Sequence, residues 1–159
     1  MRIMIDGPDG AGKTSVCEKL ANKFGCNIVR LTNGGDRSFR AYSEAMIPDN
    51  MIHDRTFLSE IIYPKYFERT SRLPEKYHTA LFDLVDLYHA RVFILTANDD
   101  ELRRRLDIRG DEFLDDFNKI KGINRDYFCY AHMHKYEIID TTNKSIDKVV
   151  KEIGGKIWL

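Results

Sequence analysis

Short apolar runs alternate with segments of helical periodicity along the whole chain. The apolar runs predict buried strands at residues 1–6, 26–31, 51–53, 92–95 and 136–139. Between the first two runs, Val16, Leu20 and Phe24 recur at helical spacing and predict a helix over residues 13–24. Gly25 is the expected end of that helix. Strands that alternate with helices in this way are typical of an α/β fold.

Further helices are predicted at residues 38–46, 56–66, 74–89, 98–110, 112–132 and 145–153. Candidate N-caps precede three of them, at Ser38, Asn98 and Ser145. Pro64 predicts a bend in the second of these helices, and Pro74 suits a first helical position. The pair Gly154-Gly155 predicts the end of the last helix, which leaves residues 156–159 as an apolar tail.

The alternation predicts a three-layer sandwich with about five parallel strands and helices on both faces of the sheet. At 159 residues, 43% of them hydrophobic, the chain is expected to form one domain over residues 1–159. Right-handed crossovers place the carboxyl ends of the strands at one edge, where ligands bind. Polar segments reach this edge after residues 6, 53, 95 and 139.

The first of these segments matches G-x-x-x-x-G-K-[ST] between a predicted strand and a predicted helix, which is the context that a P-loop requires. Glycines in such a loop let backbone N–H groups approach phosphate oxygens. The residues expected to bind ATP are Gly7, Asp9, Gly10, Ala11, Gly12, Lys13, Thr14 and Ser15.

Two side chains of the loop carry the chemistry. Lys13 is expected to reach the β- and γ-phosphates as a point charge, and the Thr14 hydroxyl to ligate Mg²⁺. A plain glycine-rich turn before a helix would explain the glycines, but it would not explain a lysine followed by a threonine. We therefore predict a nucleotide site that uses ATP and Mg²⁺.

Charge and cysteine usage narrow the function classes. The 25 basic and 25 acidic residues cancel, so no global positive field favours a long nucleic acid. Cys17, Cys26 and Cys129 lack the spacing of a zinc site and are expected to be reduced thiols. Neither a cationic leader nor an apolar run of membrane-spanning length is present, so a cytoplasmic protein without membrane contact is expected.

Asp54-Arg55, at the end of the third predicted strand, is the second functional signal. An alternative interpretation makes Asp54 a helix cap and Arg55 the partner of a surface acid. A third signal is an arginine cluster in the helix at residues 98–110, at Arg103, Arg104, Arg105 and Arg109. A solvated helix face is the alternative explanation of that cluster.

With these motifs the chain resembles the thymidylate kinases and the broader group of deoxynucleoside and nucleoside monophosphate kinases. Residues 5–14 resemble their P-loop, Asp54-Arg55 their Asp-Arg pair, and residues 102–110 their arginine-bearing lid. Only about 40 residues separate Lys13 from Asp54, fewer than in thymidylate kinases, so compact phage-type kinases look like the nearest relatives.

The resemblance implies a role for each matching residue. Asp9 would lie near the acceptor's sugar hydroxyl, Arg55 would bind the acceptor phosphate, and Asp54 would sit by Mg²⁺ or the attacking oxygen. The lid would consist of about residues 103–125, and its Arg105 and Arg109 would contact the transferring phosphate.

Other residues complete the hypothesis of an acceptor pocket: Tyr63 as a stacking ring, Phe39 from the loop side, and Arg69 and Arg72. Core packing is the alternative for the aromatic rings. The main functional prediction is phosphoryl transfer from ATP to a deoxynucleoside monophosphate, dTMP first, with small nucleotides as partners and a homodimer as the candidate assembly. The alternatives are a kinase of a hydroxyl acceptor, in which Asp54 would be a general base, and a non-kinase nucleotide switch.

Overall fold

The computed structural model describes residues 1–31, 35–110 and 116–157. Its strands form one sheet in the order β2-β3-β1-β4-β5, and all neighbouring strands are parallel. The strands are β1 (Arg2–Asp6), β2 (Asn27–Arg30), β3 (Met51–Asp54), β4 (Arg91–Thr96) and β5 (Glu137–Asp140). The predicted five-stranded parallel sheet is confirmed.

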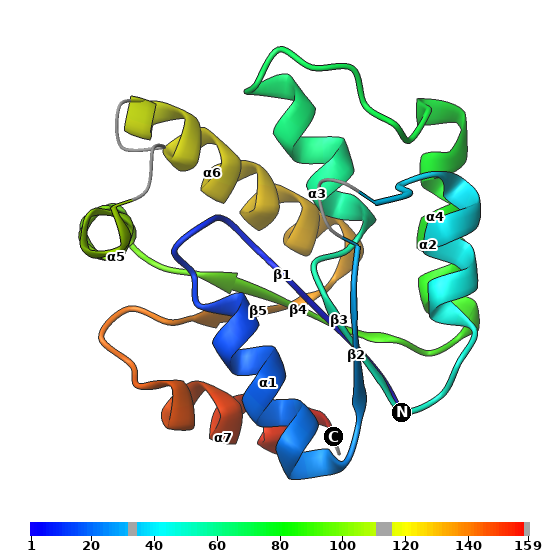
Figure 1. The fold of residues 1–159 in the computed structure, drawn as a ribbon, viewed down its shortest axis with the longest axis horizontal. Coiled ribbons are helices and arrows are strands. Elements are labelled where there is room, and N and C mark those ends of the chain that lie inside the picture. The colour runs from blue at the N-terminus through cyan, green and yellow to red at the C-terminus, as the bar shows by residue number, and fades with distance from the viewer. Residues whose placement is uncertain (32–34, 111–115, 158–159) are drawn as a thin grey trace.

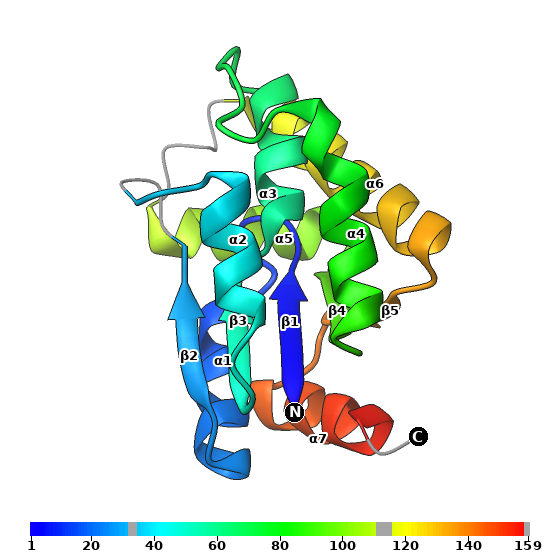
Figure 2. The same ribbon diagram turned by 90° about the vertical axis from the view of Figure 1, so that its right-hand side faces the viewer.

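Helices cover both faces of this sheet and make three layers (Figure 1). One face carries α1 (Lys13–Phe24) and α7 (Ile146–Ile157), which pack against each other. The other face carries α2 (Phe39–Met46), α3 (Phe57–Ile62), α4 (His78–Leu87) and α6 (Phe117–His134). Figure 2 shows α2 and α4 side by side on that face. The helix α5 (Asp99–Arg109) follows β4 near the carboxyl edge of the sheet.

The central strands explain why the apolar runs are continuous. Ile3, Met4 and Ile5 of β1 and Phe93, Ile94 and Leu95 of β4 are successive residues, and each is at most 1% exposed, because helices cover both faces of the sheet. A strand buried on both sides needs apolar residues at successive positions rather than at alternate ones. Among the described residues, no helix combines the length and the apolar character that crossing a lipid bilayer requires.

Several predicted helix ends are confirmed. The Ser38 hydroxyl accepts a hydrogen bond from the Ala41 amide at 3.2 Å, and the Asn98 side chain accepts one from the Glu101 amide at 2.9 Å. Gly25 and Gly110 are the C-caps of α1 and α5. The predicted bend at Pro64 takes the form of a 3-10 turn, η1 (Tyr63–Lys65), directly after α3.

Other predicted boundaries were wrong. The last helix does not stop at Gly154-Gly155 but continues to Ile157, because its buried face extends through Val150, Ile153 and Ile157 and outweighs the low helix propensity of glycine. The predicted helix at residues 74–89 is divided into η2 (Glu75–Tyr77) and α4, with Pro74 as the cap before η2 rather than a first helical residue.

The predicted start of the sixth helix at residue 112 lies outside the described residues, and α6 ends two residues later than predicted. Gly122, which breaks the helical pattern in the sequence, lies inside a continuous α6. A Cβ at this position would stand 2.3 Å from the ring of Tyr66. Gly122 therefore allows the ring of Tyr66, which directly follows η1, to pack closely against α6.

Candidate functional site

The loop between β1 and α1 brings the P-loop residues to the carboxyl edge of the sheet. Gly7 lies against β4, where a Cβ would stand 2.1 Å from the carbonyl oxygen of Leu95, so only glycine fits. Gly12 is the N-cap of α1 and has a left-handed conformation with φ of 87°. A helix N-terminus that follows such a turn is an arrangement that binds phosphate.

Lys13 is buried within this loop, and its Nζ donates a hydrogen bond to the Pro8 carbonyl at 2.6 Å. Burial lowers the pKa of Lys13 to about 8, with a smaller contribution from the charge of Arg55, and nearby carboxylates, led by Asp9, act in the opposite direction. A phosphate group would give the ammonium group a partner of opposite charge in a poorly hydrated place.

A cavity of about 580 Å³, here called the P-loop cavity, lies beside the loop. Six of the residues predicted to bind ATP line it, namely Asp9, Gly10, Gly12, Lys13, Thr14 and Ser15. Gly7 and Ala11 do not: Gly7 packs against β4, and Ala11 is buried in the core. Arg104, Arg105 and Arg109 reach this cavity from α5.

Arg105 is tied to the P-loop by several contacts. Its Nη1 donates to the Gly10 carbonyl at 3.1 Å and to the Thr141 hydroxyl at 2.9 Å, and its Nη2 donates to the Thr141 carbonyl at 2.7 Å. Its Nε donates to Glu101 at 2.8 Å. Hydrogen bonds from Arg104, and then from Arg105, lower the pKa of Glu101 to about 2 against the effect of burial. Glu101 therefore fixes two guanidinium groups at the cavity wall.

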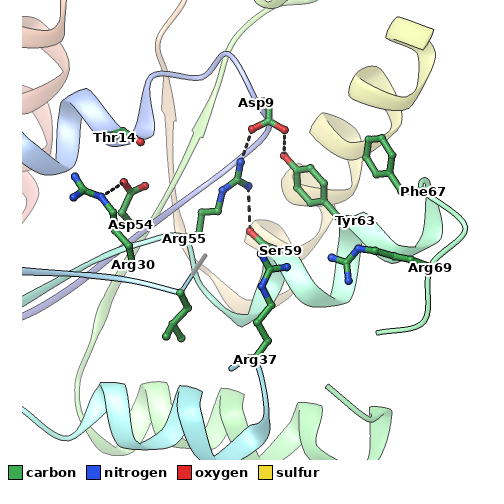
Figure 3. A pocket seen from close by; sticks show the side chains of 11 residues that line it. Asp9, Thr14, Arg30, Arg37, Asp54, Arg55, Ser59, Tyr63, Phe67 and Arg69 are labelled. Carbon is green, nitrogen blue, oxygen red and sulfur yellow. Dashed lines mark hydrogen bonds and ion pairs between the residues drawn. The ribbon is translucent and has the colours of Figure 1, made fainter. Parts of the chain in front are cut away.

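A second cavity of about 700 Å³, here called the β3 cavity, opens where β2 and β3 end (Figure 3). Asp54 and Arg30 occupy paired positions on these two strands. Arg30 Nε lies 3.1 Å from Asp54 Oδ2, and Thr14 lines the same cavity. Arg30 was not among the predicted site residues, although it lies within the predicted strand at residues 26–31; it is the last residue of β2 and so stands at the edge where ligands bind.

Arg55 lies where the two cavities meet, and its backbone is strained. It has φ of 77°, which is uncommon for a residue with a side chain, and its amide donates to the Ile5 carbonyl at 2.9 Å. Its guanidinium donates to Asp9 and, at 3.4 Å, to the Ser59 hydroxyl, and it lies 5.2 Å from the ring centre of Tyr63. Strained residues of this kind cluster at functional sites.

Asp9 is the shared partner of Arg55 and Tyr63. The Tyr63 hydroxyl donates to Asp9 Oδ2 at 2.9 Å, while Arg55 donates to Oδ1 (Figure 3). Burial would raise the pKa of Asp9, but the charges of Lys13 and Arg55 and these hydrogen bonds outweigh it and lower the pKa. Asp9 is thus a carboxylate at the boundary of both cavities.

Asp6, a fully buried carboxylate beneath the site, was missed by the sequence analysis. Oδ2 accepts from the amide and the hydroxyl of Thr56, at 2.8 and 2.7 Å, while Oδ1 accepts from Ser59 at 2.9 Å and from Tyr127 at 2.7 Å. Asp6 therefore joins β1, the segment that follows Arg55, and α6. Its signal in the sequence was an acid that ends a run of buried residues directly before the P-loop.

No protein-family model matches the chain. The SPbeta prophage-derived uncharacterized protein YorR of Bacillus subtilis is 29% identical over an alignment of 159 positions that covers 95% of both chains. The crystal structure of YorR, in complex with phosphorylated GDP, superposes with a TM-score of 0.84 and 25% identity, over 100% of this chain and 96% of that chain.

A deoxyadenosine kinase from M. mycoides with bound dATP superposes with a TM-score of 0.68 at 18% identity over the full length of both chains. A thymidylate kinase from Candida albicans superposes with a TM-score of 0.63 at 16% identity, over 98% of this chain and 89% of that chain. The chain has the fold of the P-loop kinases. At these identities the two kinases share the fold alone, so narrower membership of the thymidylate kinases stays a prediction.

Within this P-loop kinase fold, the residues predicted to bind the acceptor separate into two sets. Asp9, Arg55, Tyr63 and Arg69 line the β3 cavity. Arg72 does not line it, because its Nη1 donates to the Gly35 carbonyl at 3.2 Å. Phe39 stacks on another ring, that of Tyr77 on η2, with ring centres 4.8 Å apart.

The predicted lid, at about residues 103–125, falls on several parts of the P-loop kinase fold. Residues 103–109 belong to α5, whose Leu102 and Leu106 are fully buried, and residues 117–125 belong to α6. Residues 111–115 lie outside the described part of the chain. Arg109 lines the P-loop cavity, whereas the guanidinium of Arg103 lies 5.6 Å from the ring centre of Phe117.

Proposed function

We propose that the chain is a nucleotide kinase that transfers the γ-phosphoryl group of ATP to the phosphate of a deoxynucleoside monophosphate. The observation that carries this proposal is the meeting of two cavities. The P-loop cavity and the β3 cavity share Asp9, Thr14 and Arg55 in their linings. Phosphoryl transfer needs a donor and an acceptor held on either side of the transferred group, with positive charge around it.

The P-loop cavity suits the donor. Lys13, Arg105 and Arg109 supply positive charge where the equatorial oxygens of the transferred group would lie, and positioned charge of this kind is the main contribution to phosphoryl transfer. The Thr14 hydroxyl and the Asp54 carboxylate both line the β3 cavity, and Thr14 also lines the P-loop cavity. They offer the hard oxygen ligands that Mg²⁺ prefers, so these residues fit the ion. When bound, Mg²⁺ neutralises charge on the phosphates.

The β3 cavity suits an acceptor that carries a phosphate. Arg55 presents a planar guanidinium at the boundary, and such a group can bind a phosphate with two parallel hydrogen bonds. Asp54 Oδ2 accepts a hydrogen bond from Arg30 Nε at 3.1 Å, so this oxygen is engaged by a partner rather than open to a proton from a hydroxyl acceptor. A phosphate acceptor is already ionised near neutral pH and needs little help from a base.

A kinase of a hydroxyl acceptor is the second candidate, because Asp54 stands at the strand end where a general base would act. The deoxyadenosine kinase that shares the fold acts on a nucleoside, and polynucleotide ends or modified bases belong to the same class of acceptor. The bound nucleotide in the YorR crystal structure supports a nucleotide ligand in general. The preference for dTMP is only what the family resemblance implies, and a cytoplasmic location and a homodimer stay predictions.

The test is a panel of acceptors with ATP and Mg²⁺ held constant and ADP formation as the readout. The panel contains dTMP, dUMP, dCMP, dGMP, dAMP, the corresponding nucleosides and an oligonucleotide with a 5'-hydroxyl end. We expect turnover with monophosphates and none without Mg²⁺. Faster turnover of a nucleoside or of the oligonucleotide would contradict the proposal and favour Asp54 as a general base.

A further inference from the structure

Arg37 and Arg69 lie at the end of the β3 cavity, on the far side of Arg55 from Thr14 (Figure 3), and one buried carboxylate holds both of them. Glu60 of α3 is 0% exposed. It accepts hydrogen bonds from Arg69 Nη1 at 2.7 Å, from Arg69 Nη2 at 3.1 Å and from Arg37 Nη1 at 2.8 Å. Glu60 is therefore the common anchor of both guanidinium groups.

The charge state of Glu60 keeps this anchor in place. Burial would raise the pKa of Glu60, but hydrogen bonds from Arg69, from the Arg72 amide and from Arg37 outweigh burial and lower the pKa. A buried carboxylate with several charged donors holds them in a defined orientation, because breaking one contact would leave a charge poorly compensated. The two arginines are thus preorganised rather than freely moving side chains.

Both arginines face the cavity. They line it together with Leu31 and Phe67, whose ring stacks on Tyr63 at an interplanar angle of 11°. Within the described part of the chain, the hydrogen bonds of Arg69 to Glu60 use two of the five N–H groups of its guanidinium. The end of the cavity therefore combines apolar walls with N–H donors held in position.

Guanidinium groups donate hydrogen bonds and cannot accept them, so the occupant must present acceptors. Guanine offers two adjacent acceptors, N7 and O6, on one edge, and arginine binds this edge with two parallel bonds. Adenine replaces the second acceptor with an amino donor on the same edge. On the same edge thymine offers O4 beside a methyl group, and cytosine offers an amino donor. The N3–O2 edge of an unpaired cytosine is the competing match for an arginine, so dCMP is the critical comparison.

We propose that Arg69, held by Glu60 beside Arg37, binds the N7–O6 edge of guanine, so that dGMP is the preferred acceptor. This inference rests on the proposed function and specifies its substrate. It places the phosphate of the acceptor at Arg55, near the P-loop, and the base at the arginine pair. It also replaces the preference for dTMP, which came from the resemblance and not from contacts in the cavity.

The wild-type protein provides the decisive test, because single atoms of the acceptor can be changed. kcat/KM would be measured for dGMP, dIMP, 7-deaza-dGMP, dAMP, dCMP and dTMP. dIMP keeps N7 and O6 and should stay within a few-fold of dGMP, whereas 7-deaza-dGMP lacks N7 and should fall by about tenfold or more. dAMP, dCMP and dTMP should fall at least as far as 7-deaza-dGMP.

Variants of the arginine pair extend the test. Because glutamine suits the N6–N7 edge of adenine, Arg69→Gln should lower the ratio of dGMP to dAMP turnover by about tenfold or more. Glu60→Gln should raise the KM for dGMP more than the KM for ATP, since Glu60 is a positioning residue for the base. Arg40→Gln is the matched control: Arg40 is an exposed residue of α2 that pairs with Glu44 and does not line the cavity.

The outcomes separate this inference from the proposed function. Turnover of no monophosphate at all would refute the function. Turnover in which dGMP is no better than dTMP or dCMP, or in which 7-deaza-dGMP equals dGMP, would leave the function standing and overturn the guanine assignment. Because the nucleotide analogues are tested on the unaltered chain, misfolding of a variant cannot obscure the result.

Discussion

Replacing Arg55 by alanine removes the guanidinium at the boundary of the two cavities, and its contacts set the size of the effect. The guanidinium donates to Asp9 and Ser59 and lies over the ring of Tyr63. A hydrogen bond to a charged group contributes about 1.5–3 kcal/mol, and a guanidinium can make two to one phosphate. Allowing for non-additivity, we expect a loss of about 3–4 kcal/mol, which lowers kcat/KM for the acceptor by about 10²- to 10³-fold.

The loss should fall on the acceptor rather than on ATP. Initial rates measured over a matrix of both substrates give the two Michaelis constants separately. The KM for ATP should change little at neutral pH. The pH dependence of this KM gives a second test of the loss of Arg55. Because the charge of Arg55 helps to lower the pKa of Lys13, Arg55→Ala should raise that pKa, so the Lys13 ammonium persists to higher pH.

Two companion variants separate binding from backbone strain. Arg55→Lys keeps the charge without the planar fork and should recover only part of the acceptor affinity. Arg55→Gly also lacks the side chain, but glycine adopts φ of 77° without strain. The free energy of unfolding of Arg55→Gly should therefore be about 1 kcal/mol higher than that of Arg55→Ala, while the acceptor KM should be raised equally in both variants. An unchanged acceptor KM in Arg55→Ala, or a defect confined to ATP, would refute the placement of the acceptor phosphate at Arg55.

Three further predictions concern the surroundings of Arg55. Lys13→Ala should lower phosphoryl transfer at least about a hundredfold with an unchanged circular dichroism spectrum, and near-normal turnover of this variant would reject the P-loop assignment. In the wild-type protein, kcat/KM for ATP should fall as pH rises through about 8, because Lys13 then loses its charge. Arg109→Ala and Arg105→Ala should both lower kcat more than ATP affinity. Arg105→Ala should also lower the melting temperature, because Arg105 donates hydrogen bonds to Gly10 and Thr141. Equal melting temperatures of the two variants would contradict this. Asp6→Asn should lower the free energy of unfolding, measured in urea, by about 2–4 kcal/mol, and Tyr127→Phe should lower it by about 1 kcal/mol. An Asp6→Asn protein as stable as wild type would show that the fold does not need the carboxylate.

The sheet could be predicted because its sequence signal is local and strong. β1 and β4 are buried on both faces, so their apolar residues form unbroken runs, and the P-loop motif marks the passage from β1 into α1. Boundaries that depend on tertiary packing could not be predicted. Gly154 lies inside α7 because the buried face of that helix continues to Ile157 and packs on α1, and nothing near Gly154 in the sequence encodes that packing.

The candidate site was predictable where one segment carries the chemistry and unpredictable where several segments meet. Lys13 and Thr14 lie in a single motif, and the structure brings Asp54 and Arg55 to its side. Arg37 and Glu60 are 23 positions apart in sequence, and both appear in the sequence as ordinary charged residues. Arg72 resembles Arg69 in the sequence, yet only Arg69 faces the β3 cavity, because their orientation depends on how the chain turns after η1.

The strain at Arg55 and the burial of Asp6 have one structural cause. The chain must leave β3 beside the P-loop and turn at once into α3, and Arg55 adopts φ of 77° to make that turn. Asp6 then binds the amide and hydroxyl of Thr56 and the hydroxyl of Ser59, which fixes the turn from below. Ser59 also contacts the Arg55 guanidinium, so Asp6 orients, through Ser59, the arginine that we propose binds the acceptor phosphate. Asp6→Asn should therefore also raise the acceptor KM more than the KM for ATP, which a purely structural role of Asp6 would not do.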